Sequence, residues 1–450
     1  MNTAEKYIVT KNACKLCTPL GACLAFKGIE NTIPLLHGSQ GCATYIRRYM
    51  ISHYKEPMDI ASSSFTESTA IFGGKDNLFT GIKNVARQYN PDVIGIATTC
   101  LSETIGDDVK LYIKEFQKEN NLPGMPKLVA VSTPSYNGTH VSGYFDTLRE
   151  IADALAEGGE QSKHINIIPN MVSPEDIRHL REILNDFKLP HVLLPDYSET
   201  IDGTNWEEYQ QIPEGGTPIN DIEKMGNAAA TIEFTSTFNP ERTAGHLLDK
   251  KFQVENHKMD MPVGIRLTDQ FFNLLGKITN RSMPVKHQKE RGRLLDAYVD
   301  AHKYVFGKKA IVYGDQDFIV SMVSFLSETG IIPVLCATGA NTGVLNSRIK
   351  EVASDIADQI RVIEDSDFGD IESLAEILEP DLLIGNSKAY KISRKLNVPL
   401  IRIGFPIHDR FGGSRILHLG YRGTQQLFDR IVNAIIQKTQ DDSPVGYSYM

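Results

Sequence analysis

Val93-Ile94-Gly95-Ile96-Ala97-Thr98-Thr99 is a largely apolar run that ends directly before Cys100. A continuous apolar run of this length predicts a strand that is buried on both faces, as in a parallel sheet. Helical patterns precede and follow it, so we expect an α/β fold with doubly wound parallel sheets. Ligands bind at the carboxyl ends of the strands in such sheets. Cys100 therefore stands where a ligand is expected.

The chain has 450 residues, which is enough for about three domains. Strand and helix patterns group into three α/β units, each expected to be a mostly parallel sheet flanked by helices. A polar break at residues 157–162 separates the first two units, and a long helix predicted at residues 288–304 leads into the third. The predicted domains are residues 1–158, 159–285 and 286–450.

Three local patterns give specific structural expectations. The Gly- and Pro-rich surroundings of Cys17 and Cys42 predict loops at both cysteines. Ser64 and Glu67 have the spacing of a capping box at the start of a helix. The short apolar stretch at residues 263–265 predicts a strand of the second unit.

Charge and composition exclude several classes of partner. The 47 basic and 56 acidic residues give a net charge of −9, which argues against nucleic acid or a membrane surface as the main partner. No stretch approaches the roughly 20 apolar residues that a membrane span needs. The first residues lack the pattern of a secretory signal, so we expect a cytoplasmic protein.

Cys17, Cys42 and Cys100 are the candidate metal ligands. All three lie beside turns or a predicted strand end, and soft sulfur donors are what iron–sulfur clusters require. Gly38 and Gly41 would let the backbone approach a bulky inorganic core. Three thiolates are too few for a complete cluster, so we expect the missing ligands to come from another polypeptide at a subunit interface.

The other cysteines carry less weight. Cys14 and Cys17 form a close pair, but a zinc ribbon needs a second pair and the sequence has none. We expect Cys14 and Cys23 to be bystanders and Cys336, inside an apolar strand, to be a small core residue. The sequence alone leaves the participation of Cys14 and Cys23 open.

Several enzyme signatures are absent from the sequence. There is no phosphate-binding loop of the Gly-x-x-x-x-Gly-Lys-Ser/Thr type and no Gly-x-Gly-x-x-Gly fingerprint, which disfavours ATP hydrolysis and NAD binding. There is also no His-Glu-x-x-His zinc motif and no Gly-x-Ser-x-Gly nucleophile motif. A complete active site on this chain alone is therefore not expected.

The motif set resembles the β-type subunits of the nitrogenase component 1 superfamily. The resemblance is carried by His37-Gly38-Ser39-Gln40-Gly41-Cys42 and Thr98-Thr99-Cys100-Leu101-Ser102-Glu103, and it extends along nearly the whole chain. Further matching stretches are residues 17–22, 53–57, 72–74, 133–136, 213–217, 384–387, 404–406 and 420–423. The resemblance implies three Rossmann-like domains with the iron–sulfur cluster in the first.

Within this superfamily, residues 402–423 and 384–387 resemble the NifN-type assembly subunits most. The main hypothesis is therefore a NifN-like subunit, paired with a NifE-like α subunit in an α2β2 heterotetramer that matures the iron–molybdenum cofactor. The resemblance implies that the partner holds the cofactor or its precursor, and that a NifH-like iron protein docks on the complex.

The cysteine set favours an alternative within the same superfamily. Cys17 and Cys100 accompany Cys42 as they do in catalytic NifK-type β subunits, and Ser135 matches a serine that can join an oxidised P-cluster. The alternative is thus the β subunit of a catalytic nitrogenase, or of a nitrogenase-like enzyme such as methylthio-alkane reductase, with a NifD-like partner. The cluster would be a double-cubane P-cluster or a simple [4Fe-4S] cubane. By resemblance, Tyr45 faces the partner's cofactor and Phe72 lies where the iron protein docks.

Overall fold

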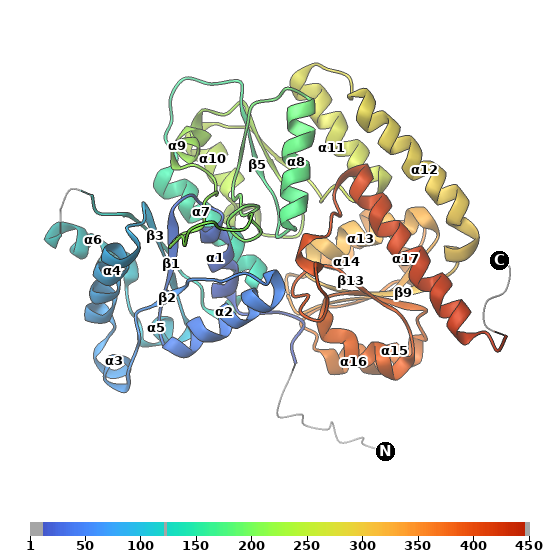
Figure 1. Ribbon diagram of the computed structural model, residues 1–450, viewed down its shortest axis with the longest axis horizontal. Helices are drawn as coiled ribbons and strands as arrows, with labels where there is room; N and C mark the ends of the chain where they lie inside the picture. Colours follow the sequence, from blue (N-terminus) through green and yellow to red (C-terminus); the bar gives the residue numbers. More distant parts are fainter. Residues whose placement is uncertain (1–11, 121–123, 446–450) are drawn as a thin grey trace.

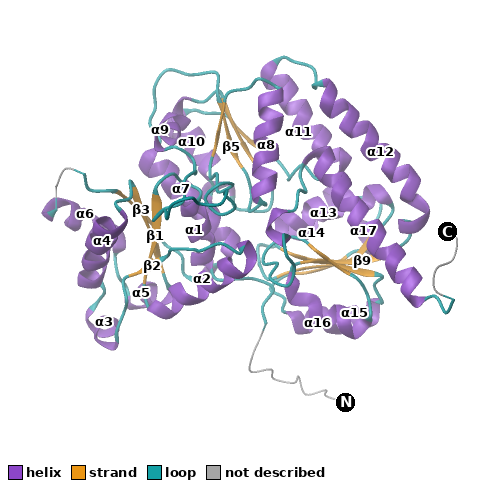
Figure 2. Cartoon of the chain, viewed as in Figure 1, coloured by secondary structure: helices purple, strands orange, loops and turns teal. Residues whose placement is uncertain are grey.

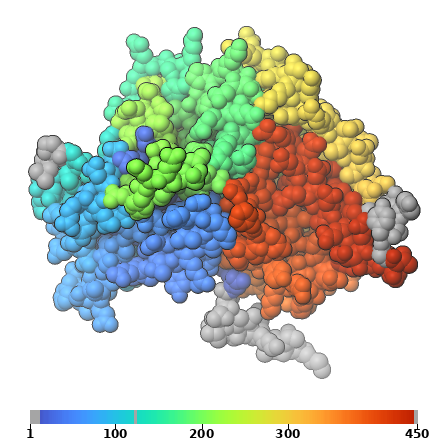
Figure 3. All heavy atoms as spheres, in the orientation of Figure 1, coloured from blue at the N-terminus to red at the C-terminus, as the bar shows by residue number. Residues whose placement is uncertain are grey.

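The computed structural model of the protein describes residues 12–120 and 124–445. Three parallel sheets, each flanked by helices, follow one another along the chain (Figures 1 and 2). Figure 3 shows that successive thirds of the chain occupy separate sectors of the surface. This confirms the predicted α/β class. The strands of each sheet fall within one predicted domain, while the boundaries themselves stay a prediction.

The first sheet has the strand order β2-β1-β3-β4, with every pairing parallel. The apolar run that predicted a buried strand is β3, and all of its residues are buried. The strands are β1 (Thr32–His37), β2 (Ala61–Ser62), β3 (Val93–Thr98) and β4 (Lys127–Val131). The helices are α1 (Thr18–Lys27), α2 (Gln40–Tyr54), α3 (Glu67–Phe72), α4 (Lys75–Tyr89), α5 (Cys100–Ile105), α6 (Val109–Glu119) and α7 (His140–Leu155).

The second sheet has the order β6-β5-β7-β8 and is also parallel. Its strands are β5 (Ile165–Ile168), β6 (His191–Leu193), β7 (Ala230–Glu233) and β8 (Asn256–Lys258). Its helices are α8 (Pro174–Asp186), α9 (Ile219–Glu223), α10 (Ala244–Phe252) and α11 (Gly264–Thr279).

The third sheet has the order β11-β10-β9-β12-β13. The long helix α12 (Val285–Val305) leads into it and packs against the last helix, α17 (Gly420–Asp442), as Figure 1 shows. The strands are β9 (Lys309–Gly314), β10 (Ile332–Thr338), β11 (Arg361–Ile363), β12 (Leu382–Gly385) and β13 (Leu400–Arg402). The remaining helices are α13 (Gln316–Thr329), α14 (Leu345–Val352), α15 (Phe368–Leu378) and α16 (Tyr390–Leu396).

Helix α1 is the buried element that positions the start of the first domain. All ten of its residues are buried, and it crosses α7 at very short range. A Cβ on Gly21 would lie 1.7 Å from the carbonyl oxygen of His140, and one on Gly143 would lie 2.0 Å from that of Thr18. Only glycine therefore permits this approach of the two helices.

Two local predictions were wrong. The stretch at residues 263–265 is not a strand, because Gly264 begins α11 and the edge strand is the polar β8. The amides of Ile265 and Arg266 donate to the carboxylate of Glu328 on α13, a distant cap that the local sequence does not reveal. Ser64 has φ of +57° and caps nothing, since Thr66 is the N-cap of α3.

Asp317 on α13 links the second and third sheets through buried hydrogen bonds. Its carboxylate accepts from Asn170 Nδ2 at 3.0 Å, from Thr235 Oγ1 at 2.6 Å and from the amides of Ser236 and Thr237 at 2.8 and 2.9 Å. Burial raises the pKa of Asp317, while these donors oppose that shift. A buried carboxyl with this many donors is satisfied only in the native arrangement of the two sheets.

We expect Asp317→Ala to lower the free energy of unfolding by about 3–5 kcal/mol, because it leaves several buried donors without an acceptor. Thermal unfolding of the purified complex measures the effect. Asp300→Ala, on the outward part of α12, is the control and should leave the melting temperature unchanged. A melting temperature of Asp317→Ala equal to that of the control would contradict the assignment.

Candidate functional site

The three candidate cysteines each lie at the start of a helix beside the carboxyl edge of the first sheet. We call this edge, with Cys17, Cys42 and Cys100, the cysteine edge. Cys17 is the N-cap of α1, Cys42 is the third residue of α2 and Cys100 is the first residue of α5. Cys42 therefore belongs to a helix and not to the predicted loop.

Hydrogen bonds hold the segments that carry Cys42 and Cys100 together. The parallel register pairs His37 with Thr98, and the hydroxyl of Thr99 donates to the carbonyl of His37 at 3.1 Å. A Cβ on Gly38 would lie 2.2 Å from Thr99 Oγ1. Gly38 is thus needed for packing against Thr99, and its approach to a cluster stays a prediction.

Ser135 connects the segments that carry Cys17 and Cys100. Its amide donates to Cys100 Sγ at 3.3 Å, and its hydroxyl oxygen accepts from the amide of Thr18 at 3.2 Å. The segment is anchored on the sheet because Thr133 exchanges two hydrogen bonds with Thr98, at 2.7 and 2.6 Å. The structure thereby brings Ser135 next to two of the three cysteine segments.

The exposure of the cysteines separates them into two groups. Cys17 and Cys100 are exposed and Cys42 is half-buried, whereas Cys14, Cys23 and Cys336 are buried. Burial raises the pKa of Cys14 and of Cys23 to about 12, so both remain protonated thiols at neutral pH. This agrees with the expectation that they are bystanders, because a metal ligand must lose its proton.

The site fits the chemistry of a shared iron–sulfur cluster on three observations. Its thiols are open to a partner, an amide already donates to one sulfur, and a Cβ on the exposed Gly41 would meet only Ser39 Oγ, at 3.7 Å. Within residues 12–120 and 124–445, no three His, Cys, Asp or Glu side chains are arranged to hold a single metal ion. The cysteines of a polynuclear cluster bind different irons and need not meet at one point.

The two aromatic candidates are exposed near the cysteines. Tyr45 is 64% exposed and lies one helical turn after Cys42 on α2. Phe72 is 85% exposed at the end of α3, which packs against α5, the helix that begins at Cys100 (Figure 1).

A buried network behind the cysteine edge positions the loop that follows Phe72. The Nε2 of His37 lies 3.0 Å from the carboxylate of Asp107, which accepts from the amide of Gly74 at 3.1 Å. Burial lowers the pKa of His37, although Asp107 opposes the shift. No sequence pattern predicts the role of Asp107, because its hydrogen-bond partners His37 and Gly74 are distant from it along the chain.

The third domain also reaches the cysteine edge. The amide of Cys14 donates to Ser366, its carbonyl accepts from Gly339, and the ammonium of Lys388 donates to the carbonyl of Ala13 at 3.3 Å. Burial lowers the pKa of Lys388, and the nearby Cys14 and Cys17 oppose the shift. Because Lys388 is far from Ala13 along the chain, no local sequence pattern predicts this contact.

Comparison with known proteins identifies the family. A profile described as nitrogenase component 1 type oxidoreductase matches residues 17–436. The chain is 36% identical to the nitrogenase molybdenum-iron protein beta chain of Clostridium pasteurianum, over 97% of this chain and 95% of that one. It is 33% identical to the beta chain of Azotobacter vinelandii, over 98% and 86% of the two chains.

A solved structure, "Nitrogenase Cp1 at pH 6.5", superposes with a TM-score of 0.95 at 34% identity and covers 100% of this chain and 98% of that one. The chain therefore belongs to the nitrogenase component 1 family. The resemblance inferred from the motifs is confirmed at this level, and the finer assignment to NifN-type subunits is not. No helix in the described part of the chain is long and apolar enough to cross a membrane.

Two buried histidines make the fold sensitive to acid. Burial lowers the pKa of His53 and of His140 to about 3. The Nδ1 of His140 accepts from the amide of Leu16 at 3.4 Å, and that of His53 accepts from the amide of Ile407 at 2.8 Å. Both rings are therefore neutral in the folded protein, and His140 holds the residue before Cys17.

We expect the free energy of unfolding to fall as the pH drops below about 6.5. In this range the two histidines bind protons in the unfolded chain but stay neutral in the folded chain. Each histidine contributes about 1.4 kcal/mol per pH unit between about 6.5 and 3. Melting temperatures between pH 7.5 and 5 measure this slope. His140→Gln should flatten it, whereas His302→Gln, at an exposed position, should not. A wild-type melting temperature that is constant over this range would refute the prediction.

Proposed function

We propose that the chain is the β-type subunit of a catalytic nitrogenase or nitrogenase-like reductase. The observation that carries the proposal is the full cysteine set, Cys17, Cys42 and Cys100, accompanied by Ser135, on a chain that aligns end to end with nitrogenase beta chains. The relatives' names describe molybdenum-iron proteins, which favours the catalytic reading over the assembly reading.

In this proposal, the three cysteines bind one side of a P-cluster-like iron–sulfur cluster, and an α-type partner binds the other side. Such a cluster transfers electrons when it is bound. The chain's own contribution is to hold the thiolates at three helix N-termini, to donate the Ser135 amide to Cys100 Sγ, and to offer the Ser135 hydroxyl as a further oxygen donor.

The partner surfaces follow from the exposed side chains. Tyr45 would face the α-type partner, which holds the iron–molybdenum cofactor or its counterpart, in an α2β2 heterotetramer. Phe72, with its exposed neighbour Ile71, would form the docking surface for a NifH-like iron protein. Large exposed apolar side chains next to each other are a feature of protein–protein contacts.

A second candidate function is the NifN-like subunit of a scaffold for cofactor assembly, paired with a NifE-like partner. The observation that favours it is the likeness of residues 402–423 and 384–387 to assembly subunits. These residues include the ends of β12 and β13 and the start of α17, in the third domain.

Activity assays separate the two functions. The chain, purified with its α-type partner, is assayed with iron protein for reduction of acetylene and of dinitrogen, and for transfer of cofactor to cofactor-free nitrogenase. If the chain is a catalytic subunit, we expect the complex to reduce substrate through many turnovers. Transfer of cofactor without turnover would overturn the catalytic proposal in favour of the scaffold, and turnover only with another substrate would point to a nitrogenase-like reductase.

Substitution of the cysteines tests the ligand set. Cys17→Ala and Cys100→Ala should each lose most of the iron shared at the interface and change its electron paramagnetic resonance spectrum, because each removes one of three donors. Cys23→Ala, on the same helix as Cys17 but buried, is the matched control and should keep the wild-type iron content. Unchanged iron and spectrum in Cys17→Ala would remove that residue from the ligand set.

A further inference from the structure

A small cavity lies where the three domains meet, away from the cysteine edge. Its volume is about 50 Å³, and it is lined by α8, α13, the end of α2 and the loops before α11, after β13 and before α17. Most of its wall is apolar, including Met171, Met261, Met322 and Phe405.

Two buried polar atoms in this cavity have no hydrogen-bond partner among the described residues. They are the Nε2 of His418 and the Oγ of Ser321. Leaving such an atom dry costs free energy, and buried polar groups in folded proteins are nearly always satisfied by protein or by ordered water. Two orphaned atoms in one cavity therefore indicate a ligand that the protein chain itself does not supply.

The orientation of His418 defines what the cavity can bind. The Nδ1 of His418 lies 3.0 Å from the carboxylate of Asp176, which also accepts from the amides of His418 and Leu419. These donors hold the pKa of the Asp176 carboxyl below its usual range, so it is ionised and receives the Nδ1 proton. With Nδ1 bonded to Asp176, Nε2 is the ring atom that needs a hydrogen-bond partner in the cavity.

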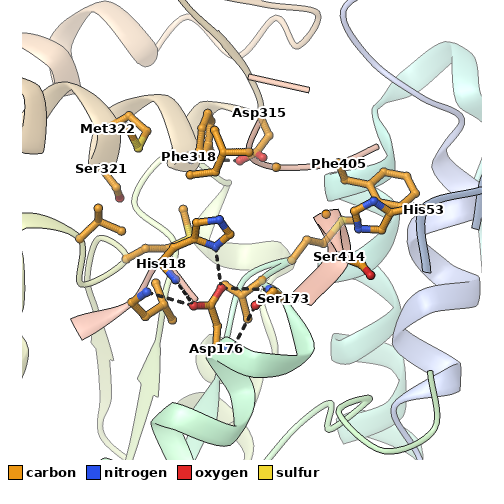
Figure 4. A pocket seen from close by; sticks show the side chains of 18 of the residues that line it. His53, Ser173, Asp176, Asp315, Phe318, Ser321, Met322, Phe405, Ser414 and His418 are labelled. Atoms are coloured by element: carbon orange, nitrogen blue, oxygen red, sulfur yellow. Dashed lines mark hydrogen bonds and ion pairs between the residues drawn. The ribbon is translucent and has the colours of Figure 1, made fainter. Parts of the chain in front are cut away.

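Figure 4 shows the geometry of the cavity wall. The Nε2 of His418 is turned away from Asp176, toward the space bounded by Asp315, Phe318 and Phe405, and the hydroxyl of Ser321 lies on another side of the same ring. A water needs about 10–15 Å³ of such volume, so the cavity has room for roughly three or four.

Asp315 contributes to the walls of two cavities. Asp315 also lines a larger cavity of about 370 Å³, whose wall includes Gln316, Asp317 and Arg242. Burial raises the pKa of Asp315 to about 7. Near neutral pH this carboxyl can therefore offer either a hydrogen-bond donor or an acceptor to a molecule bound in the cavity.

We propose that the cavity binds a cluster of small neutral hydroxylic molecules, in the first place three or four ordered waters, that forms hydrogen bonds with His418 Nε2 and Ser321 Oγ. The cluster replaces direct side-chain contacts at the junction of the three domains. The shared chemistry is an O–H group, and water and a small alcohol are its two sources.

A structure of the chain with its partner at about 1.5 Å resolution tests the proposal directly. We expect density within hydrogen-bond distance of both His418 Nε2 and Ser321 Oγ. A second structure from protein kept free of alcohols and glycols should retain it, and loss of the density there would assign the ligand to a small alcohol instead of water. An empty cavity in both structures would overturn the proposal.

Substitution of Ser321 gives an independent readout. If water satisfies its hydroxyl, Ser321→Ala removes a real hydrogen bond and should lower the melting temperature by about 1–3 °C. The matched control is Ser393→Ala, which removes a buried serine hydroxyl that donates to the carbonyl of Val398 at 2.7 Å and should show a similar loss. A higher melting temperature for Ser321→Ala would mean that the hydroxyl is dry, which contradicts the proposal.

Discussion

The parallel register of β1 with β3 is the constraint on which the candidate site depends. Because His37 is paired with Thr98, the two chain segments that leave these strands run side by side and enter α2 and α5 together. The cross-link from Thr99 to the His37 carbonyl and the tight packing at Gly38 fix this arrangement. The positions of Cys42 and Cys100 are consequently set by the strand register together with the buried side chain of Thr99.

Much of the fold was predictable from local patterns. The cores of buried strands such as β3 and β9 are apolar runs, and runs of this kind are typical of a parallel sheet. The edge strand β8 has the polar sequence Asn-His-Lys, so no hydrophobic pattern predicts it. The start of α11 was missed because its amides are capped by Glu328 from another helix, a contact that exists only in the folded chain.

The sequence singles out the candidate site residues, but it does not reveal the contacts that position them. Residue type and the neighbouring Gly, Pro and strand-end patterns single out the three cysteines. The helix N-termini at each cysteine depend on where α1, α2 and α5 begin, and element boundaries are the least certain part of any sequence-based prediction. The hydrogen bonds of Ser135 and the approach of Lys388 join residues that are far apart along the chain, so only the folded structure reveals them.

The anchoring of the first described residues on the third sheet bears on the order in which the protein matures. Asn12 and Cys14 bond to Phe368, Ser366 and Gly339, all of which are synthesised late. Residues 12–14 therefore reach their final place only after most of the chain has left the ribosome. Leu16 and Thr18, on either side of Cys17, are instead held by His140 and Ser135 of the first domain, so Cys17 can take its place before the third sheet is made.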